Sequence, residues 1–305
     1  MKKKYSGVVV PMVTPVTHQG HLDVASVERI VELFSVNGVA PLLMGTTGEG
    51  NSVSRSDGLL MVETAARAAK GRILIYAGLT GNCFSELCAQ AEAYSRAGAD
   101  VIVATLPTYY ALTPAQMENY YKTLADSITG PLMMYNILAT THMSIPEDVV
   151  QRLADHPRIV GLKDSERDAD RLCRLAAFAR DRADFAFFCG CAAFSALTLK
   201  AGADGIVPSS GNFVPDIYMQ LYHAAVTGDN EKAQRLQTLT NTIGEIYQKG
   251  RTLGESLAAL KVMMQTKRLC QPWMLPPLSR LDEGEERSVT YQANLILSTL
   301  GIKPF

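Results

Sequence analysis

Short apolar runs alternate with longer amphipathic segments along the first three quarters of this chain. Eight runs rich in aliphatic and β-branched residues predict strands near 7–13, 39–44, 73–77, 101–104, 132–135, 159–162, 185–189 and 205–208. The segments that follow them have helical spacing, and they predict helices near 24–37, 54–69, 84–96, 114–126, 146–154, 168–180, 193–200 and 214–226. Eight consecutive βα units are typical of a closed parallel barrel, so the sequence predicts an α/β protein with the (β/α)8 TIM-barrel fold.

Local signals agree with this division. The run Thr113-Pro114-Ala115-Gln116 combines an N-cap, a first-turn proline and a capping-box glutamine, which marks a helix start. The tetrapeptide Ala-Gly-Ala-Asp stands at 97–100 and again at 201–204, each time between a predicted helix and a predicted strand. This repetition is a weak additional indication of a repeating unit.

The strand pattern stops at about residue 228. Apolar residues then recur at helical spacing at Ala233, Leu236, Leu239, Ile243 and Ile246. Further helices are expected near 252–267 and 285–299. We therefore expect a catalytic barrel at 1–227 and a C-terminal subdomain of about three helices at 228–305, which packs on the barrel or forms a subunit contact.

The bulk composition favours a small-molecule enzyme over other classes. The chain has 305 residues with a formal net charge of −1, and it has no long run of like charge that would indicate a nucleic-acid or membrane partner. Six cysteines lack the spacing of zinc or disulfide sites, and the five histidines are scattered, so no metal is expected. The N-terminus lacks the apolar stretch of an export signal, and no run is long enough to span a membrane, so a cytoplasmic location is expected.

One lysine is the strongest candidate for chemistry. Lys163 ends the apolar run 159–162, and burial there would favour a neutral amine that can attack a carbonyl. One helix-length segment upstream, Tyr135 ends another apolar run, so the two side chains are expected at the ends of adjacent parallel strands. Counting by twos places Ile159, Gly161 and Lys163 on one face, and it places Met133 with Tyr135.

Other polar residues follow the predicted strands, where TIM-barrel active sites are built. Gly45-Thr46-Thr47-Gly48-Glu49-Gly50 follows the second strand, and its N–H groups and hydroxyls could hold a small carboxylate. Tyr109 and Tyr110 follow the fourth strand, Asp164 and Ser165 follow Lys163, and Gly190 follows the seventh strand.

Taken together, these motifs resemble the dihydrodipicolinate synthase and N-acetylneuraminate lyase family of pyruvate-dependent class I aldolases. Gly45-Thr46-Thr47-Gly48-Glu49, Tyr135-Asn136 and Gly161-Leu162-Lys163 occur in that family's order, and the resemblance covers nearly the whole chain. It implies that Lys163 forms a Schiff base with pyruvate or another 2-oxo acid, that Tyr135 carries protons, and that no cofactor is needed. It implies that Thr47 links Tyr135 to Tyr110 of a neighbouring subunit, hence a homo-oligomer, either a dimer or a tetramer. The substrate-binding positions would be Thr46, Thr47, Gly48, Tyr109, Thr140, Ser165, Gly190 and Val207.

Two departures bear on the substrate. Thr140 stands where the synthases commonly carry an arginine for the second substrate, and Leu138 replaces the usual proline. Gly190-Cys191-Ala192-Ala193 offers none of the acidic residues with which the sialic acid lyases bind sugar hydroxyls. Both named activities are therefore disfavoured.

The leading hypothesis is a carbon–carbon lyase that cleaves a 2-keto-3-deoxy sugar acid or a substrate like 4-hydroxy-2-oxoglutarate. The alternatives are dihydrodipicolinate synthase or N-acetylneuraminate lyase activity, a keto-deoxy sugar acid dehydratase, and a non-catalytic barrel that binds a 2-oxo acid. Simple packing also remains open for Tyr109 and Tyr110 and for Cys191, which otherwise lines the site. Arg167 either contacts an anionic substrate or, as we expect, pairs with Glu166 or Asp168.

Overall fold

Each of the eight apolar runs forms a strand, and the strands close into a barrel. In the computed structural model, which describes residues 3–302, the strands are β1 (Gly7–Pro11), β2 (Ala40–Leu43), β3 (Tyr76–Leu79), β4 (Val101–Thr105), β5 (Leu132–Asn136), β6 (Ile159–Asp164), β7 (Ala186–Cys189) and β8 (Gly205–Ile206). They pair in parallel in chain order, and β8 closes on β1. The predicted (β/α)8 barrel is confirmed.

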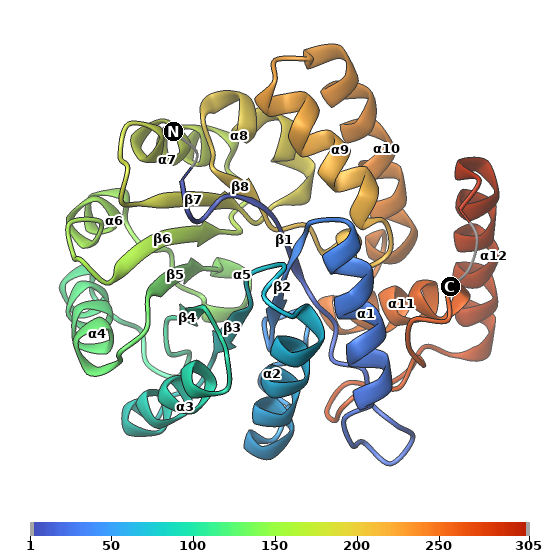
Figure 1. The fold of residues 1–305 in the computed structure, drawn as a ribbon, viewed down its shortest axis with the longest axis horizontal. Helices are drawn as coiled ribbons and strands as arrows, with labels where there is room; N and C mark the ends of the chain where they lie inside the picture. The colour runs from blue at the N-terminus through green and yellow to red at the C-terminus, as the bar shows by residue number, and fades with distance from the viewer. Residues whose placement is uncertain (1–2, 303–305) are drawn as a thin grey trace.

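Helices form a ring outside the strands (Figure 1). They are α1 (Val24–Val36), α2 (Arg55–Ala69), α3 (Phe84–Arg96), α4 (Pro114–Ser127), α6 (Glu147–Leu153), α7 (Ala169–Arg180), α8 (Ser195–Ala201) and α9 (Pro215–Val226). The predicted capping box of α4 is present, with Thr113 and Gln116 each bonding the other's backbone. The spacing of apolar residues did not predict three short elements: α5 (Leu138–Thr141) and the 3-10 turns η1 (Ala192–Phe194) and η2 (Ser209–Asn212).

The apolar residues separate into two clusters, as the alternation of a barrel strand requires. One fills the barrel interior and includes Val9, Leu42, Tyr76, Val101, Val103, Met133, Tyr135, Phe188 and Val207. The other lies between the strands and the helices and continues into the C-terminal helices through Ile243, Tyr247 and Met263. The expected sharing of a face by Met133 and Tyr135 is confirmed.

The prediction that Ile159, Gly161 and Lys163 share one face of β6 is wrong for Ile159. Leu132 pairs with Ile159 but Met133 pairs with Gly161, so Val160 is an extra residue that shifts the register. Ile159 consequently packs in the outer cluster, whereas Val160 packs against the inner one. Ile159 therefore does not share the face of Lys163, and the bulge re-aims the end of β6 into the barrel.

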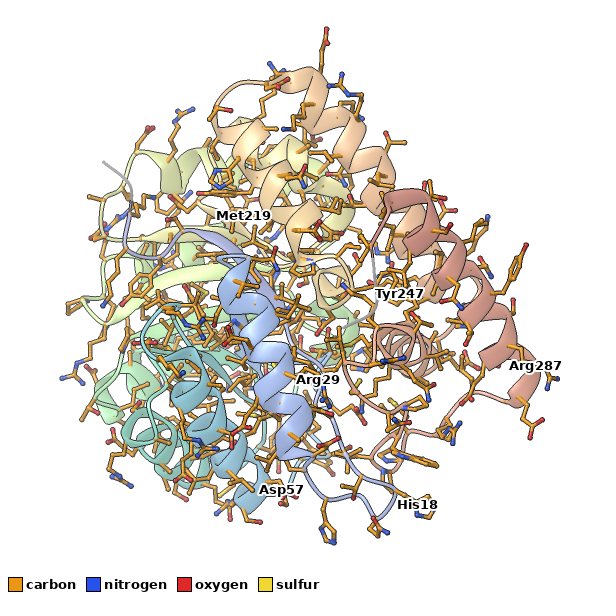
Figure 2. All side chains as sticks on the ribbon, turned by 45° about the vertical axis from the view of Figure 1, so that its right-hand side comes forward. His18, Arg29, Asp57, Met219, Tyr247 and Arg287 are labelled. Carbon is orange, nitrogen blue, oxygen red and sulfur yellow. The ribbon has the colours of Figure 1, made fainter. Side chains whose placement is uncertain are left out.

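Three helices follow the barrel, as predicted: α10 (Asn230–Gln248), α11 (Leu253–Thr266) and α12 (Glu283–Leu300). They lie at one side of the ring, beyond α1 and α9 (Figure 1). Tyr247 of α10 is buried, and its hydroxyl lies 2.6 Å from that of Ser209 in η2; Figure 2 shows its place near the C-terminal helices. At the edge of the molecule, His18 meets Trp273 edge to face at 4.7 Å between ring centroids (His18 is labelled in Figure 2). No helix among residues 3–302 has both the length and the apolar character needed to cross a bilayer.

Candidate active site

Lys163 and Tyr135 lie side by side at the C-terminal ends of β6 and β5. The two residues are direct partners in the parallel ladder. The Lys163 Nζ lies 3.7 Å from the centroid of the Tyr135 ring, and only 3% of Lys163 and 5% of Tyr135 is exposed. The amine and the phenol predicted from sequence to be neighbours are thus brought together inside the barrel.

A glycine makes room beneath the lysine. A Cβ at Gly161 would lie 2.4 Å from the carbonyl oxygen of Ala186 and 3.2 Å from the Met133 methyl group. Since no larger residue fits there, the β6 backbone can approach β7 closely and place the Lys163 stem against the apolar interior.

The environment of Tyr135 favours its ionised form. Burial by itself raises the pKa of this phenol, but the charge of Lys163 and hydrogen bonds with Thr46, Ser165 and Lys163 lower the pKa further than burial raises it. The net pKa of Tyr135 is below the usual value of a phenol. By contrast, burial raises the pKa of Tyr76, which lies deeper in the same barrel interior. Tyr135 is therefore suited to exchange protons.

The loop after β2 meets Tyr135 from across the barrel. It winds into tight turns, because the carbonyl of Gly45 accepts from the N–H groups of both Gly48 and Gly50. The hydroxyl of Thr46 lies 3.5 Å from that of Tyr135. The sequence analysis expected Thr47 to contact this phenol, but within this chain the contact is made by Thr46. Two adjacent residues in such a turn point in different directions, and Thr47 is buried.

The same loop leaves two donors available. The N–H groups of Thr46 and Thr47 donate no hydrogen bond to any residue in the part of the chain that the structure describes. Gly48 is held in place, since its carbonyl accepts from the Thr14 hydroxyl, and a Cβ at this position would lie 2.8 Å from the Met12 carbonyl. Free N–H groups on a fixed turn form a site for a carboxylate.

A buried ion pair fixes the far end of this loop. Glu49 has a left-handed backbone with φ of 54°, and its carboxylate pairs with Lys261 of α11, both side chains being fully buried. The second carboxylate oxygen accepts from the N–H of Leu275 at 2.8 Å, and Lys261 donates to the carbonyl of Trp273 at 2.7 Å. The sequence analysis did not predict this pair, because its members stand 212 positions apart in the chain.

A second charged network lies behind Lys163. Asp164 is fully buried and accepts from Arg171 and from the side-chain amide of Asn136, each at 3.0 Å. Asn136 also donates to Glu166 at 2.7 Å, while its amide oxygen accepts from the N–H of Ile145 at 3.0 Å. Burial raises the pKa of Asp164, although Arg171 acts to lower it. These bonds tie the ends of β5 and β6 together directly behind the amine and the phenol.

The opening of the barrel is bordered by residues that follow strand ends. We call them the rim: Thr46, Tyr109, Tyr110, Thr140, Ser165, Arg167 and Cys191. Tyr109 and Tyr110 are 77% and 71% exposed and meet edge to face at 4.9 Å between centroids, while Thr140 in α5 is half-buried. Gly190 lies between Ser165 and Cys191, and Val207 is in the apolar interior beneath them, where its N–H donates to Cys189.

Comparison with known proteins shows the family of this chain. Residues 4–295 match the model of the dihydrodipicolinate synthetase family. The chain belongs to this family. It is accordingly an enzyme, of the Schiff-base-forming lyase and aldolase kind.

Individual relatives cover different lengths of the chain. A 4-hydroxy-tetrahydrodipicolinate synthase of Laribacter hongkongensis is 31% identical over 76% of this chain and 79% of its own. A probable 2-dehydro-3-deoxy-D-pentonate aldolase of Escherichia coli K12 is 28% identical over 99% of both chains. The crystal structure of YagE, a prophage protein of the same family from Escherichia coli K12 in complex with pyruvate, superposes with a TM-score of 0.90 at 26% identity, covering 98% of this chain and all of that one.

Proposed function

We propose that this enzyme is a pyruvate-dependent aldolase that cleaves 2-keto-3-deoxy acids through a Schiff base on Lys163. The contact of the Lys163 amine with the Tyr135 ring at 3.7 Å, inside an apolar barrel, is the observation that carries the proposal. The full-length similarity to a sugar-acid aldolase supports the substrate class. Thr140 and the half-buried Cys191 are both uncharged, which disfavours the synthase and sialic acid lyase activities.

The chemistry follows from the two side chains. The Lys163 amine attacks C2 of the 2-keto acid, and loss of water gives a protonated imine. Tyr135 accepts the proton of the C4 hydroxyl, the C3–C4 bond breaks, and its electrons move to C3 to give an enamine while the aldehyde leaves. Protonation of C3 and addition of water then release pyruvate and the free amine. In the reverse direction the same enamine attacks an aldehyde.

The loop after β2 is the proposed carboxylate site. The free N–H groups of Thr46 and Thr47 are available for the C1 carboxylate of the substrate, and Gly48 keeps their backbone fixed. Thr46 also connects to the phenol, so one loop positions the substrate and the proton carrier. We assign Ser165 to the same group, because it acts to lower the pKa of Tyr135.

We further propose that the enzyme is a homo-oligomer in which the exposed pair Tyr109 and Tyr110 reaches a neighbouring subunit. Large aromatic side chains exposed to more than two-thirds on one loop are typical of a contact surface. Light scattering of the wild type and of a Y110A variant tests this: a dimer or tetramer is expected for the wild type, with weakened association for the variant.

Reductive trapping tests the Schiff base. Incubation with pyruvate and borohydride is expected to add one reduced pyruvyl group, and peptide mapping should place it on Lys163. Lys267 is an internal control, because it is also buried and burial lowers its pKa, but its amine donates to the carbonyl of Phe213 at 2.8 Å. The variant K163M should show neither adduct nor turnover. An adduct on Lys267, or full activity of K163M, would refute the assignment.

A further inference from the structure

The acidic residues nearest to Lys163 are all held by other groups. Asp164 is bound by Arg171 and Asn136, and Glu166 accepts from Asn136 and Ser144. Asp168 accepts from the N–H of Arg171 as the N-cap of α7. None of these carboxylates therefore depends on Arg167, which stands between them in the chain.

Arg167 is left as a free cation. It is exposed, and the ion pair expected with Glu166 or Asp168 is not formed; no carboxylate of residues 3–302 lies within 4.0 Å of its guanidinium. Its side chain also makes no hydrogen bond to those residues. The expectation failed because Asn136, Ser144 and Arg171 compete for the same acids. An arginine free of internal partners can bind an external anion.

The position of Arg167 places this charge beside the site. The N–H of Gly190 donates to the carbonyl of Asp164 at 2.6 Å, so the loops after β6 and β7 adjoin. A Cβ at Gly190 would lie 2.1 Å from the Ser165 hydroxyl oxygen, and Ser165 in turn acts to lower the pKa of Tyr135. Burial raises the pKa of Cys191, and the charge of Arg167 opposes this effect, so the guanidinium lies near the thiol of Cys191.

The rest of the rim carries no charge: Thr46, Tyr109, Tyr110, Thr140, Ser165 and Cys191 are all neutral side chains. We propose that Arg167 binds a second carboxylate at the distal end of the substrate, so that the enzyme prefers 2-keto-3-deoxy diacids, whose cleavage gives pyruvate and an aldehyde that bears a carboxylate. This assignment rests on the proposed aldolase function and narrows its substrate class. The C1 carboxylate stays with Thr46 and Thr47, and the C4 hydroxyl with Tyr135.

Two small aldehydes test the proposal as a matched pair. Glyoxylate and glycolaldehyde differ only in carrying a carboxylate or a hydroxymethyl group, and each accepts the pyruvate enamine. Condensation with pyruvate is measured for the wild type, R167M, R167K and the control R96M, which changes another exposed arginine at the last turn of α3. The Lys163 adduct with pyruvate is trapped in parallel for every variant.

We expect the wild type to prefer glyoxylate and R167M to lose about 10-fold in kcat/KM for glyoxylate, which corresponds to 1.4 kcal/mol. Glycolaldehyde, the pyruvate KM and the adduct should be unchanged, R167K should keep part of the preference, and R96M all of it. Added salt should reduce the preference for glyoxylate in the wild type and in R96M but not in R167M, because the pairing of Arg167 with the carboxylate is exposed to solvent.

Three results would overturn the inference: a wild-type preference for glycolaldehyde, an equal loss for both aldehydes in R167M, or no loss for either. In each of these cases an intact Lys163 adduct would leave the aldolase assignment standing. Absence of the adduct in the wild type would instead reject the proposed function, and the role of Arg167 with it.

Discussion

The buried pair Glu49 and Lys261 yields the sharpest prediction about how the barrel supports its site. Substitution K261M removes the ammonium and leaves the Glu49 carboxylate with the single N–H of Leu275 as its hydrogen-bond donor. Breaking a fully buried pair in this way costs about 3–5 kcal/mol, because the remaining charge stays without its partner. Methionine has a similar length, so loss of packing volume contributes little.

This cost can be converted into a melting shift. The entropy of unfolding is about 2.1 cal/mol/K per residue, which for 305 residues gives roughly 0.64 kcal/mol/K. A loss of about 3–5 kcal/mol therefore lowers the thermal midpoint by about 5–8 °C. Since Glu49 ends the loop that carries Thr46, the rate of pyruvate trapping at Lys163 should fall as well.

Calorimetry and the rate of pyruvate trapping, both measured on K261M, K249M and the double variant E49Q/K261M, check the two parts. Lys249 is the matched control: it also pairs with a glutamate, at 3.9 Å, but its side chain is 79% exposed, so its loss should shift the midpoint very little. The double variant, in which no buried charge is left, should recover part of the lost stability. Equal midpoints for K261M and K249M would refute the reasoning that burial makes this pair important.

Three further substitutions probe the site itself. Y135F should lower kcat by about 10²–10⁴-fold with Lys163 still trapped by pyruvate and borohydride, since only proton transfer is removed; unchanged turnover would reject Tyr135 as the proton carrier. The charge of Lys163 lowers the pKa of Tyr135 against the effect of burial, so K163M should move the ionisation of this phenol to higher pH. The ionisation is followed by tyrosinate absorbance, with the spectra of Y135F and of the double variant K163M/Y135F subtracted as references for the wild type and for K163M. A shift to lower pH would contradict the electrostatics. G161A should destabilise the barrel by about 1–3 kcal/mol and slow trapping, because its Cβ would meet the Ala186 carbonyl oxygen at 2.4 Å; an unaltered melting midpoint and trapping rate would show that β6 can move aside.

The apolar pattern predicted the architecture because each element of a βα barrel is encoded locally. The predicted limits of α3, 84–96, match Phe84–Arg96, since a helix buries one stripe and its ends carry turn signals. The pairing of Tyr135 with Lys163 also followed from order alone, because consecutive strands of a barrel are neighbours. Features that depend on neighbouring residues or on the order of the strands could therefore be predicted from the sequence.

Features that depend on contacts distant in the chain could not be predicted. The extra residue Val160 cannot be recognised from the sequence, because its neighbours in the run are also apolar. It nevertheless decides which side chains of β6 face inward. In the loop after β2, turn geometry decides whether Thr46 or Thr47 contacts the Tyr135 hydroxyl, and two adjacent threonines in the sequence do not specify that geometry.

The partners of the acids after Lys163 explain why Arg167 was misassigned. Sequence proximity favoured a pair with Glu166 or Asp168, but a charge is satisfied by the groups that lie closest in space. Those groups are Asn136 and Ser144 for Glu166, and the N–H of Arg171 for Asp168. The same interactions that hold β5 and β6 in register thus release Arg167 at the rim. Structural and substrate-binding charges are separated here by burial: Arg171 is 6% exposed and serves the fold, whereas Arg167 is exposed and remains available to a ligand. A consequence is that R171M should alter both stability and catalysis, while R167M should alter only the choice of aldehyde.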